Sequence, residues 1–549
     1  MKNNNTLIEG EDVENNLLTD RWLTVETPDG TRKRLSLPEL FSAMERNEVA
    51  SFPEVLPHQS APWHVFLVQL ACHCLEKAGK VSELPSPDRT KPWAMLGQHS
   101  PDEWLAMIRG IVPEYFQKYP HDEPWCLVTS DLSKPAFMQV PLSEKNFKDY
   151  KGVEEYPDDL DLLISSKNFD VKSGTTKQSS AESWIFALVS LQTNSGFLGR
   201  GNYGISRQNG GLSIRPVFTL QSFSSPGARW GRDALVILNC PDDWELYTFC
   251  RNEKDMRLLW LEPWDGTTSC ALRDLHPLFI EICRRLRAVR TGDKLAVKKA
   301  ASKCSRVDIG QTGGNLRDPW EPVVIDKKGC HVFGSDLNYA NMAKIFAEAD
   351  GIQKPLLLRY HSGIDSPSGA KAWCSALVKG QGKTEGYVER LIPIDTRGDI
   401  DEETLWSVSS TMIDLVKTAK NKVLGVALGR FLCCGTSADG RGAIDWNSTA
   451  LKNWLPPVKD GFEKEIDSLF FKYLWAACSR FKDEENSDGS WLAPWKECLV
   501  RLVRKYYDAG VSSLPGSSGQ GLKARALSSL TLEHLIATHL KTSVEEAEA

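Results

Sequence analysis

The stretch that decides between the candidate folds of this chain is NSGFLGRGNYGISRQNGGLSIRP, residues 194–216. Its six glycines give a backbone that can approach a ligand closely and expose its N–H groups. Gly199, Gly201 and Gly204 match the GxGxxG pattern of dinucleotide-binding folds, which must follow a strand and precede a helix, with an acidic residue about 20 positions later. Here the preceding AESWIFALVSLQ, residues 181–192, looks helical, and neither the helix nor the acidic residue follows. The stretch therefore disfavours a Rossmann fold.

Polar side chains alternate with the glycines of this stretch. They are Arg200, Asn202, Tyr203, Arg207, Asn209 and Arg215. Glycines admit close packing against a sugar-phosphate backbone or a minor groove, and arginines bind phosphates. The pattern is therefore typical of a loop that contacts nucleic acid, and a purely structural glycine loop is the alternative.

A second glycine-bearing element is KGQGKTEGYVER, residues 379–390. Its GKT resembles the end of a Walker A motif, but Leu377 stands where the first glycine of that motif is required. The element lies between an apolar run ending at Val378 and a strand-like stretch from Tyr387 to Ile394. This arrangement predicts a polar hairpin tip suited to pushing one side chain outward, with an inert hairpin as the alternative.

Positive charge is concentrated between residues 284 and 306 of an otherwise acidic protein. The whole chain has 66 basic and 72 acidic residues, a net charge of −6, whereas this segment has nine basic residues and one acid, a balance of +8. A solvated helix face is the usual explanation of such a run. A phosphate-binding surface is the sharper alternative, and it would make affinity fall steeply with salt.

The rest of the chain predicts an α+β fold in two parts. Its 549 residues are enough for several domains. After residue 401, apolar residues recur at helical spacing in four segments, which predicts an antiparallel four-helix bundle. The segments are residues 405–423, 462–477, 495–507 and 523–540. We expect a large mixed α/β domain over residues 1–400 and the bundle over residues 401–549.

Several function classes are disfavoured by composition. The first residues lack an apolar core and no run of about 18 apolar residues occurs, which argues against a signal peptide or a membrane span and predicts a cytoplasmic protein. The 14 cysteines form no CxxC pair, so we expect buried, reduced thiols and no metal. The sequence has ten histidines and no nucleophile elbow, so we expect neither an enzyme nor a cofactor.

At several motifs the sequence resembles the CasA family, the large subunits of type I-E Cascade CRISPR surveillance complexes. The motifs are LLTDRWLTVETPDG from Leu17, FMQVPL from Phe137, DLLISSKNFDVKSG from Asp161, WIFALVSLQTNSGFLGRGNYGISRQNGGLSIRP from Trp184, LLWLEPWDG from Leu258, RDPWEP from Arg317 and GQGKTEGYVER from Gly380. The run from Trp184 is the most specific. The resemblance spans most of the chain.

The resemblance implies a subunit that reads a protospacer-adjacent motif in double-stranded DNA, helps to start R-loop formation and recruits a helicase-nuclease. Pairing with the guide RNA would supply most of the sequence specificity. The implied partners are target DNA, guide RNA, and the backbone, small helical and end-capping subunits of the complex. No membrane and no catalysis are implied.

Site residues follow from the same resemblance. The glycine loop that faces the minor groove comprises Gly196, Phe197, Gly199, Arg200, Gly201 and Asn202. The wedge is Gln381 with Gly382. A mobile loop comprises Asn168, Phe169, Val171 and Lys172. A basic patch comprises Lys298, Lys299, Lys303 and Arg306, of which Lys303 and Arg306 are candidates for probing the minor groove.

Two departures from the family pattern bear on this reading. The glycine loop is longer than in shorter members and carries Arg200 and Tyr203 where they keep small residues, so the preferred motif can differ. The cysteine-rich insertion of some members has no counterpart. Two other function classes stay open: a nucleotide-dependent enzyme that uses the GKT or GxGxxG elements, and a structural adaptor without DNA contact.

Overall fold

The computed structural model describes residues 13–164, 180–208, 214–240, 254–291, 294–308, 310, 312–326, 329–332, 337–380, 383–394, 400–433, 444–483, 489–513 and 519–540. The chain forms two compact units. The first comprises Met1–Leu337 with Asp350–Ile392, and the second Asn338–Ala349 with Pro393–Ala549. The sequence predicted one linear cut after residue 400. The short segment 338–349 groups instead with the second unit, an excursion of the chain that composition does not reveal.

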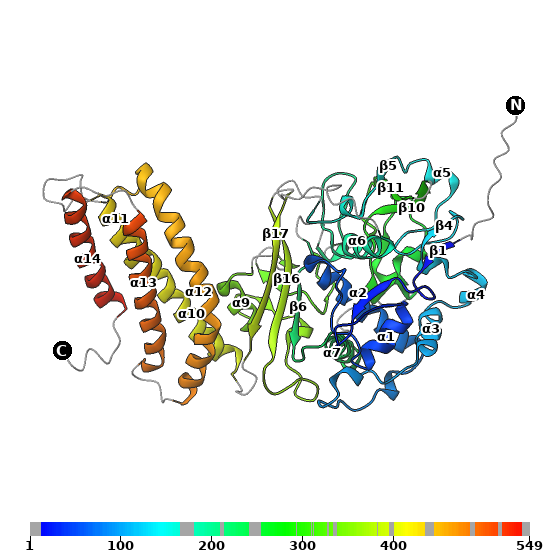
Figure 1. Ribbon diagram of the computed structural model, residues 1–549, viewed down its shortest axis with the longest axis horizontal. Helices are drawn as coiled ribbons and strands as arrows, with labels where there is room; N and C mark the ends of the chain where they lie inside the picture. Colours follow the sequence, from blue (N-terminus) through cyan, green and yellow to red (C-terminus); the bar gives the residue numbers. More distant parts are fainter. Residues whose placement is uncertain are drawn as a thin grey trace. The chain divides into compact units, whose positions relative to one another are not determined.

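The first unit mixes helices with short strands, and the α+β prediction is confirmed. Its longer helices are α1 (Leu37–Glu45), α2 (Pro57–Lys77), α3 (Pro101–Gly110), α6 (Ala181–Asn194) and α7 (Pro226–Asn239), and α4 (Tyr115–Lys118) and α5 (Glu144–Phe147) are single turns. Figure 1 shows them around small sheets rather than on one large sheet. The described strands of the whole chain form seven sheets of two or three strands.

Two sheets matter for the site. The hairpin of β10 (Arg285–Thr291) and β11 (Lys294–Ala300) is extended by β5 (Gly152–Glu154). The hairpin of β16 (Lys371–Gly380) and β17 (Lys383–Pro393) is extended by β6 (Val217–Gln221). Away from the site, a tight turn at Asp29-Gly30 joins β2 (Leu23–Glu26) to β3 (Arg32–Leu35).

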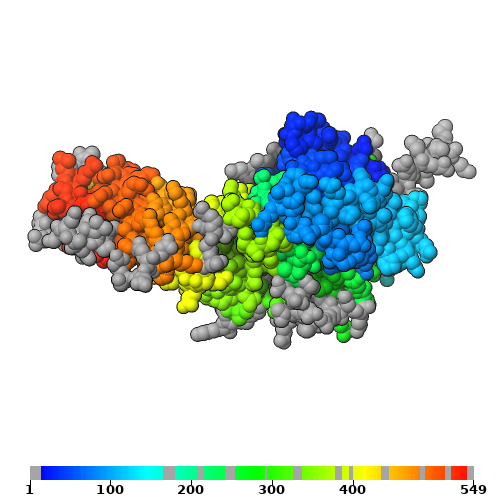
Figure 2. All heavy atoms as spheres, turned by 90° about the horizontal axis from the view of Figure 1, so that it is seen from below, coloured from blue at the N-terminus to red at the C-terminus, as the bar shows by residue number. Residues whose placement is uncertain are grey.

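The remaining strands are short. They are β1 (Val13–Asn16), β4 (Cys126–Thr129), β7 (Met256–Leu258), β8 (Cys270–Ala271), β9 (Leu275–Ile280), β12 (Val307–Asp308), β13 (Val323–Asp326), β14 (Gly329–Val332) and β15 (Ile352–Gln353). Several pairs join distant parts of the sequence, such as β1 with β4 and β6 with β16. The space-filling view shows the same feature, with the early blue residues lying on green segments that come much later in the chain (Figure 2).

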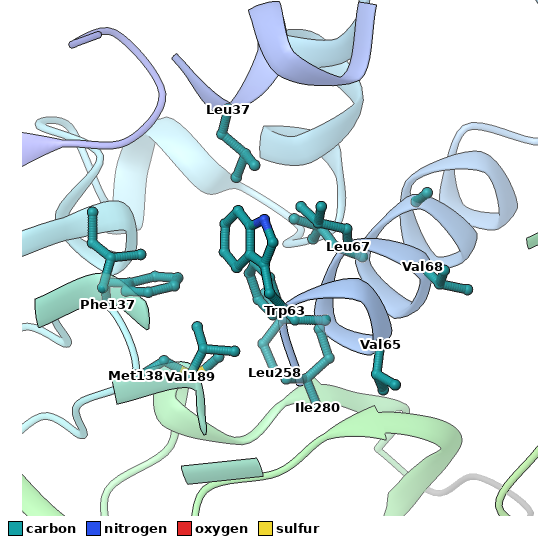
Figure 3. Close-up of a cluster of buried hydrophobic side chains, with 14 of the residues drawn as sticks. Leu37, Trp63, Val65, Leu67, Val68, Phe137, Met138, Val189, Leu258 and Ile280 are labelled. Carbon is teal, nitrogen blue, oxygen red and sulfur yellow. The ribbon is translucent and has the colours of Figure 1, made fainter. Parts of the chain in front are cut away.

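The core of the first unit is centred on the apolar helix α2. Trp63 of α2 is 2% exposed, and its ring lies 5.0 Å from that of Phe186 and 5.5 Å from that of Phe66, centroid to centroid. Figure 3 shows Trp63 among side chains from other elements, including Leu37 of α1 and Val189 of α6. Burying rings of this size stabilises the packed helices by several kcal/mol, about 3–5 for one tryptophan. This core fixes the C-terminal end of α6, from which the glycine-rich stretch emerges.

The second unit is helical. Its helices are α9 (Tyr339–Phe346), α10 (Glu402–Thr418), α11 (Gly425–Cys433), α12 (Thr449–Asp483), α13 (Ala493–Ser513) and α14 (Gly519–His539). A π-helical turn, Ala419–Leu424, makes α10 and α11 one continuous helix. The long helices lie side by side, as Figure 1 shows, and correspond to the four segments that the sequence marked as amphipathic. The apolar stripe containing Phe462, Ile466 and Phe470 of α12 is buried.

The structure also bears on two predictions from composition. No described helix has both the length and the apolarity needed to cross a bilayer. Eight of the cysteines that the structure describes are buried, as expected: Cys72, Cys74, Cys126, Cys283, Cys374, Cys433, Cys478 and Cys498. Burial raises the pKa of the thiols of Cys72 and Cys74 well above its usual value, so both stay protonated at neutral pH.

Candidate nucleic-acid interface

The glycine loop is a short, closed turn that begins where α6 ends. The N–H of Leu198 donates to the carbonyl of Asn202 (3.0 Å), and the N–H of Asn202 donates to the carbonyl of Gly199 (2.9 Å). Gly199 has φ +119° and Gly201 φ +90°, conformations that residues with a side chain rarely adopt. The tip residues Leu198, Arg200 and Asn202 are exposed. The loop therefore presents backbone and two polar side chains to the outside.

The base of this loop is held by buried contacts. Arg284, 8% exposed, donates from Nη2 to the Ser195 hydroxyl (2.8 Å) and the Gly196 carbonyl (3.1 Å). The N–H of Ser302 donates to the carbonyl of Gly201 (3.1 Å). The two arms of the loop pass so closely that a Cβ on Gly204 would lie 2.4 Å from the carbonyl carbon of Gly196. A Cβ on Gly199, in contrast, would meet nothing within 4 Å. The loop is thus fixed at its base and open at its tip.

Two arginines of the glycine-rich stretch do not face phosphates, contrary to the sequence expectation. Arg207 and Arg215 are 3% and 2% exposed. Both form ion pairs with Asp318 of the RDPWEP motif, at 2.8 Å and 2.5 Å, and Arg207 also pairs with Glu281 at 3.2 Å. Burial lowers the pKa of Arg215 despite Asp318. These ion pairs fix the middle and the C-terminal end of the stretch to RDPWEP, so Arg200 is the arginine of the stretch left for a ligand.

The basic run 284–306 is neither a helix nor a uniformly solvated face. It forms the β10–β11 hairpin, and Arg284, Arg285 and Arg287 are buried. Arg287, fully buried, donates to the carbonyls of Lys134 (3.0 Å) and Asp131 (3.1 Å), and burial lowers its pKa to about 10. The sequence expectation of a solvated helix face is wrong because carbonyl groups from distant segments solvate these guanidinium groups.

The predicted basic patch loses one member. Arg306 is 3% exposed and donates to the carbonyls of Leu259 and Glu262, at 3.1 Å and 3.0 Å, so it is not available to DNA as predicted. Lys298 lies over the ring of Phe147 (4.9 Å) and Lys299 pairs with Glu154. Lys303 is exposed, next to Ser302 beneath the glycine loop. The patch reduces to Lys298, Lys299 and Lys303.

The other predicted site residues lie outside the described residues. These are the wedge residues Gln381 and Gly382, and Asn168, Phe169, Val171 and Lys172 of the predicted mobile loop. The two strands that flank the wedge are described and form the predicted hairpin. Its base is tied down by Trp373, which donates to Glu389 (2.6 Å) and contacts the ring of His64 on α2.

A cluster of buried hydrogen bonds around Asp161 could not be recognised from the sequence. Asp161, 1% exposed, accepts hydrogen bonds from the N–H groups of Leu163 and Ile164 (2.9 Å each) and from Gln59 (2.8 Å). Its Oδ2 lies 2.6 Å from Nε2 of His58, at the start of α2. The His58 ring in turn contacts Tyr387 of β17. The start of α2 therefore contacts both the segment leading to residue 165 and the hairpin.

We expect the substitution Asp161→Asn to destabilise the protein by about 1–3 kcal/mol at neutral pH, the usual cost of a weakened buried hydrogen-bond set. Burial alone would raise the pKa of Asp161, but the hydrogen bonds from His58, Ile164 and Leu163 outweigh it and lower the pKa. The stability that this carboxylate contributes is therefore present above its unfolded pKa of about 3.9 and is lost as the pH falls through the lower folded value. Denaturant unfolding of both proteins between pH 7 and pH 3 measures this. A difference that stays constant down to pH 3 contradicts the assignment.

The two nucleotide-binding motifs lack the structural context that their chemistry needs. Gly199, Gly201 and Gly204 follow helix α6 and lead to a 3₁₀ turn, Ser206–Gln208, not from a strand to a long helix. Lys383 and Thr384 begin a strand of an antiparallel hairpin, not a helix that could bind phosphate at its N-terminus.

One group of potential metal ligands occurs among the described residues, formed by His73, Glu76 and His276. Arg257 donates from Nη1 to Nδ1 of His73 (3.1 Å) and to Glu76 (2.5 Å). The ligand atom of His73 is thus occupied, and a guanidinium group stands where a cation would bind. Burial lowers the pKa of His73 well below its usual value. This cluster ties α2 to β9 and does not fit a metal centre.

Comparison with known proteins finds a family model that matches part of the chain. Residues 16–217 match the family model of CRISPR-associated protein Cse1. Over this part of its length the chain is similar to the Cse1 (CasA) family. A comparison with curated protein sequences finds no match. Of the motifs discussed above, the glycine loop lies inside the region matched by sequence, and the hairpin and the helical unit are matched by fold.

Solved Cse1 structures share the fold over nearly the whole chain. The chain is similar to CasA (Cse1) of Thermus thermophilus, with a TM-score of 0.60 and 15% identity over 96% of this chain and 99% of that one. Cse1 of Acidimicrobium ferrooxidans gives 0.59 and 14% over 97% and 100%. A chain of a CRISPR RNA-guided surveillance complex gives 0.54 and 13% over 95% and 99%.

Proposed function

We propose that this protein is the large subunit of an RNA-guided type I-E Cascade complex, and that it recognises the protospacer-adjacent motif in double-stranded DNA. The match of residues 16–217 to the Cse1 family model supports the Cascade role, as does the likeness of the fold to a chain of a CRISPR RNA-guided surveillance complex. In this role the protein binds and opens DNA without catalysing a reaction, in the cytoplasm. The partners are the guide RNA, the backbone, small helical and end-capping subunits, and a helicase-nuclease that is recruited later.

The observation that carries the proposal is the glycine loop, fixed at its base and open at its tip. The open backbone at Gly199, where a Cβ would meet nothing within 4 Å, fits a minor groove, which is about 6 Å wide. The minor groove distinguishes A·T from G·C but not the two orientations of each pair. A loop that has one exposed arginine and one exposed asparagine beside its glycines is therefore expected to accept several motifs and to reject others.

The wedge and the flanking elements complete the proposal. Gln381, with Gly382, enters beneath the recognised base pairs and lowers the cost of opening the first ones, which is a few kcal/mol for each unstacked step. Phe169 stacks on a base and Lys172 meets a phosphate. Lys298, Lys299 and Lys303 supply positive charge beside the glycine loop.

The variant Gln381→Ala tests this proposal. We expect R-loop formation by the reconstituted complex to slow by about tenfold, a barrier increase of ~1.4 kcal/mol, while binding of a target that is already unpaired stays unchanged. Stopped-flow fluorescence on paired and pre-opened targets separates the two steps. Gln353→Ala, a glutamine in the short strand β15, is the matched control. Equal rates of target opening for wild type and Gln381→Ala would contradict the proposed role of Gln381 as a wedge.

Arg200 should act through charge. Replacing it with alanine removes one phosphate contact, so we expect the slope of log K against log salt to become less steep by about 1. Competition binding of a motif-bearing duplex between 50 and 200 mM salt measures the slope, with the exposed Arg89→Ala as control. An unchanged slope would show that Arg200 contacts no phosphate.

A further inference from the structure

A cleft of about 360 Å³ lies beside the glycine loop. Leu198 and Asn202 of the loop line it, together with residues of the β5–β11–β10 sheet and of the segment that precedes residue 165. Its floor is apolar, since Leu160, Leu162 and Leu286 line it and are at most 5% exposed. Its volume is within the range of sites for small molecules, about 300–1,000 Å³. The cleft is thus large enough for a planar ring and continuous with the glycine loop.

The wall of this cleft contains a buried cation whose hydrogen bonds are incomplete. Arg285 lines the cleft and is 4% exposed. Its Nη1 donates to the carbonyl of Ala301 (2.8 Å), whereas Nε and Nη2 make no well-aligned hydrogen bond among the described residues. The guanidinium group lies 5.2 Å from the centroid of the Tyr150 ring, and burial raises the pKa of the Tyr150 hydroxyl to about 12 although the interaction with Arg285 opposes the rise. Unmatched donors on a buried side chain are costly and rare, so they point to a ligand that carries acceptors.

The charges at the rim select the kind of ligand. Asp149, Glu154 and Asp159 line the cleft together with Lys151 and Lys299, so acidic and basic groups are mixed there. Arg284 and Arg285 add two cations to the lining, so its charges nearly cancel and a strongly charged ligand gains little there. A neutral heteroaromatic ring suits both features, because its faces pack on leucines and its edge offers donors and acceptors.

We propose that this cleft binds one unstacked nucleobase of the target DNA, with a carbonyl oxygen on its edge facing the donors of Arg285. The inference rests on the proposed function and deepens it, since it gives the base displaced during opening a place on the protein. Moving one base out of the stack costs a few kcal/mol, and burial in an apolar cleft offsets part of that cost.

The test uses the reconstituted complex and target duplexes in which pyrrolocytosine, a fluorescent base with a carbonyl edge, replaces one base at a time around the motif. Ala300→Trp fills the cleft. Val153→Trp is the matched control, because Val153 lies on β5 between two cleft residues and its side chain points to the opposite face. Arg285→Met keeps most of the buried volume and removes the hydrogen-bond donors. It is the second cleft variant and replaces Ala300→Trp if that protein does not assemble into the complex.

We expect one position whose emission rises at least twofold on binding to wild type and to Val153→Trp. The rise should be lost with Ala300→Trp and reduced with Arg285→Met. A rise that persists in both cleft variants, or no responding position in wild type, overturns the inference. Mobility shifts of the same samples report motif-dependent binding. Binding without a cleft-dependent signal overturns the inference alone, and loss of motif dependence in wild type overturns the proposed function.

Discussion

Gly199→Ala is expected to lower motif-dependent R-loop formation by at least about tenfold, equivalent to ~1.4 kcal/mol or more of lost interaction. A side chain at φ +119° is strained, and the added methyl group points into open space at the loop tip, where the DNA backbone must approach. Assembly with the guide RNA and the other subunits should stay intact because the loop base does not involve this Cβ.

Gly30→Ala is the matched control for this variant. Gly30 also has a positive φ, +82°, and a Cβ there would also meet nothing within 4 Å. It lies in the turn between β2 and β3, so the substitution carries comparable backbone strain without touching the proposed interface. Opening rates measured on target duplexes compare the two variants. Equal losses in both would assign the effect to strain and would contradict the role of the loop.

Asp318→Ala should be the most damaging single substitution for the stability of the first unit. Removing one partner of a buried ion pair costs about 3–5 kcal/mol because it leaves charge buried without compensation, and here two guanidinium groups lose their shared carboxylate. Arg207 keeps its ion pair with Glu281 in this variant. Denaturant unfolding followed by tryptophan fluorescence measures the loss.

Asp88→Ala is the control that separates the effect of losing the ion pairs from the effect of losing the local turn. Asp88 accepts the N–H of Thr90 (2.9 Å) as Asp318 accepts the N–H of Trp320 (3.0 Å), but Asp88 is exposed. We expect a loss below about 1 kcal/mol for this control, as for other surface changes. Similar losses in the two variants would show that the buried pairs contribute little.

Features with a local signal could be predicted from the sequence. Ser36, Pro38 and Glu39 begin α1 as helix-start residues do: Ser36 accepts from the Glu39 N–H, and the Glu39 carboxylate accepts from the Ser36 N–H (2.9 Å). The helical segments after residue 401 and the hairpin around residue 381 are likewise set by spacing and turn residues. The glycine loop could be predicted because its glycines lie close together in one short stretch of sequence.

Features that depend on partners distant in the sequence could not be predicted from it. Arg207, Arg215, Arg287 and Arg306 look like solvent-exposed charge in the sequence, yet each is buried by acceptors that other segments provide. Asp161 likewise has its partners at the start of α2, about 100 residues earlier in sequence. The density of basic residues in a sequence does not distinguish a phosphate-binding surface from a buried network of hydrogen bonds. The predicted basic patch therefore included Arg306, which is buried.

The central claim is tested most directly by target opening on duplexes with randomised flanking motifs, using the complex assembled with wild-type protein, without it, and with Gly199→Ala. We predict that wild-type complex opens a restricted set of motifs, that omission of the protein abolishes opening, and that Gly199→Ala assembles but loses motif preference. Opening of the same motifs in all three samples would contradict the account and leave the protein a scaffold without a role in reading DNA.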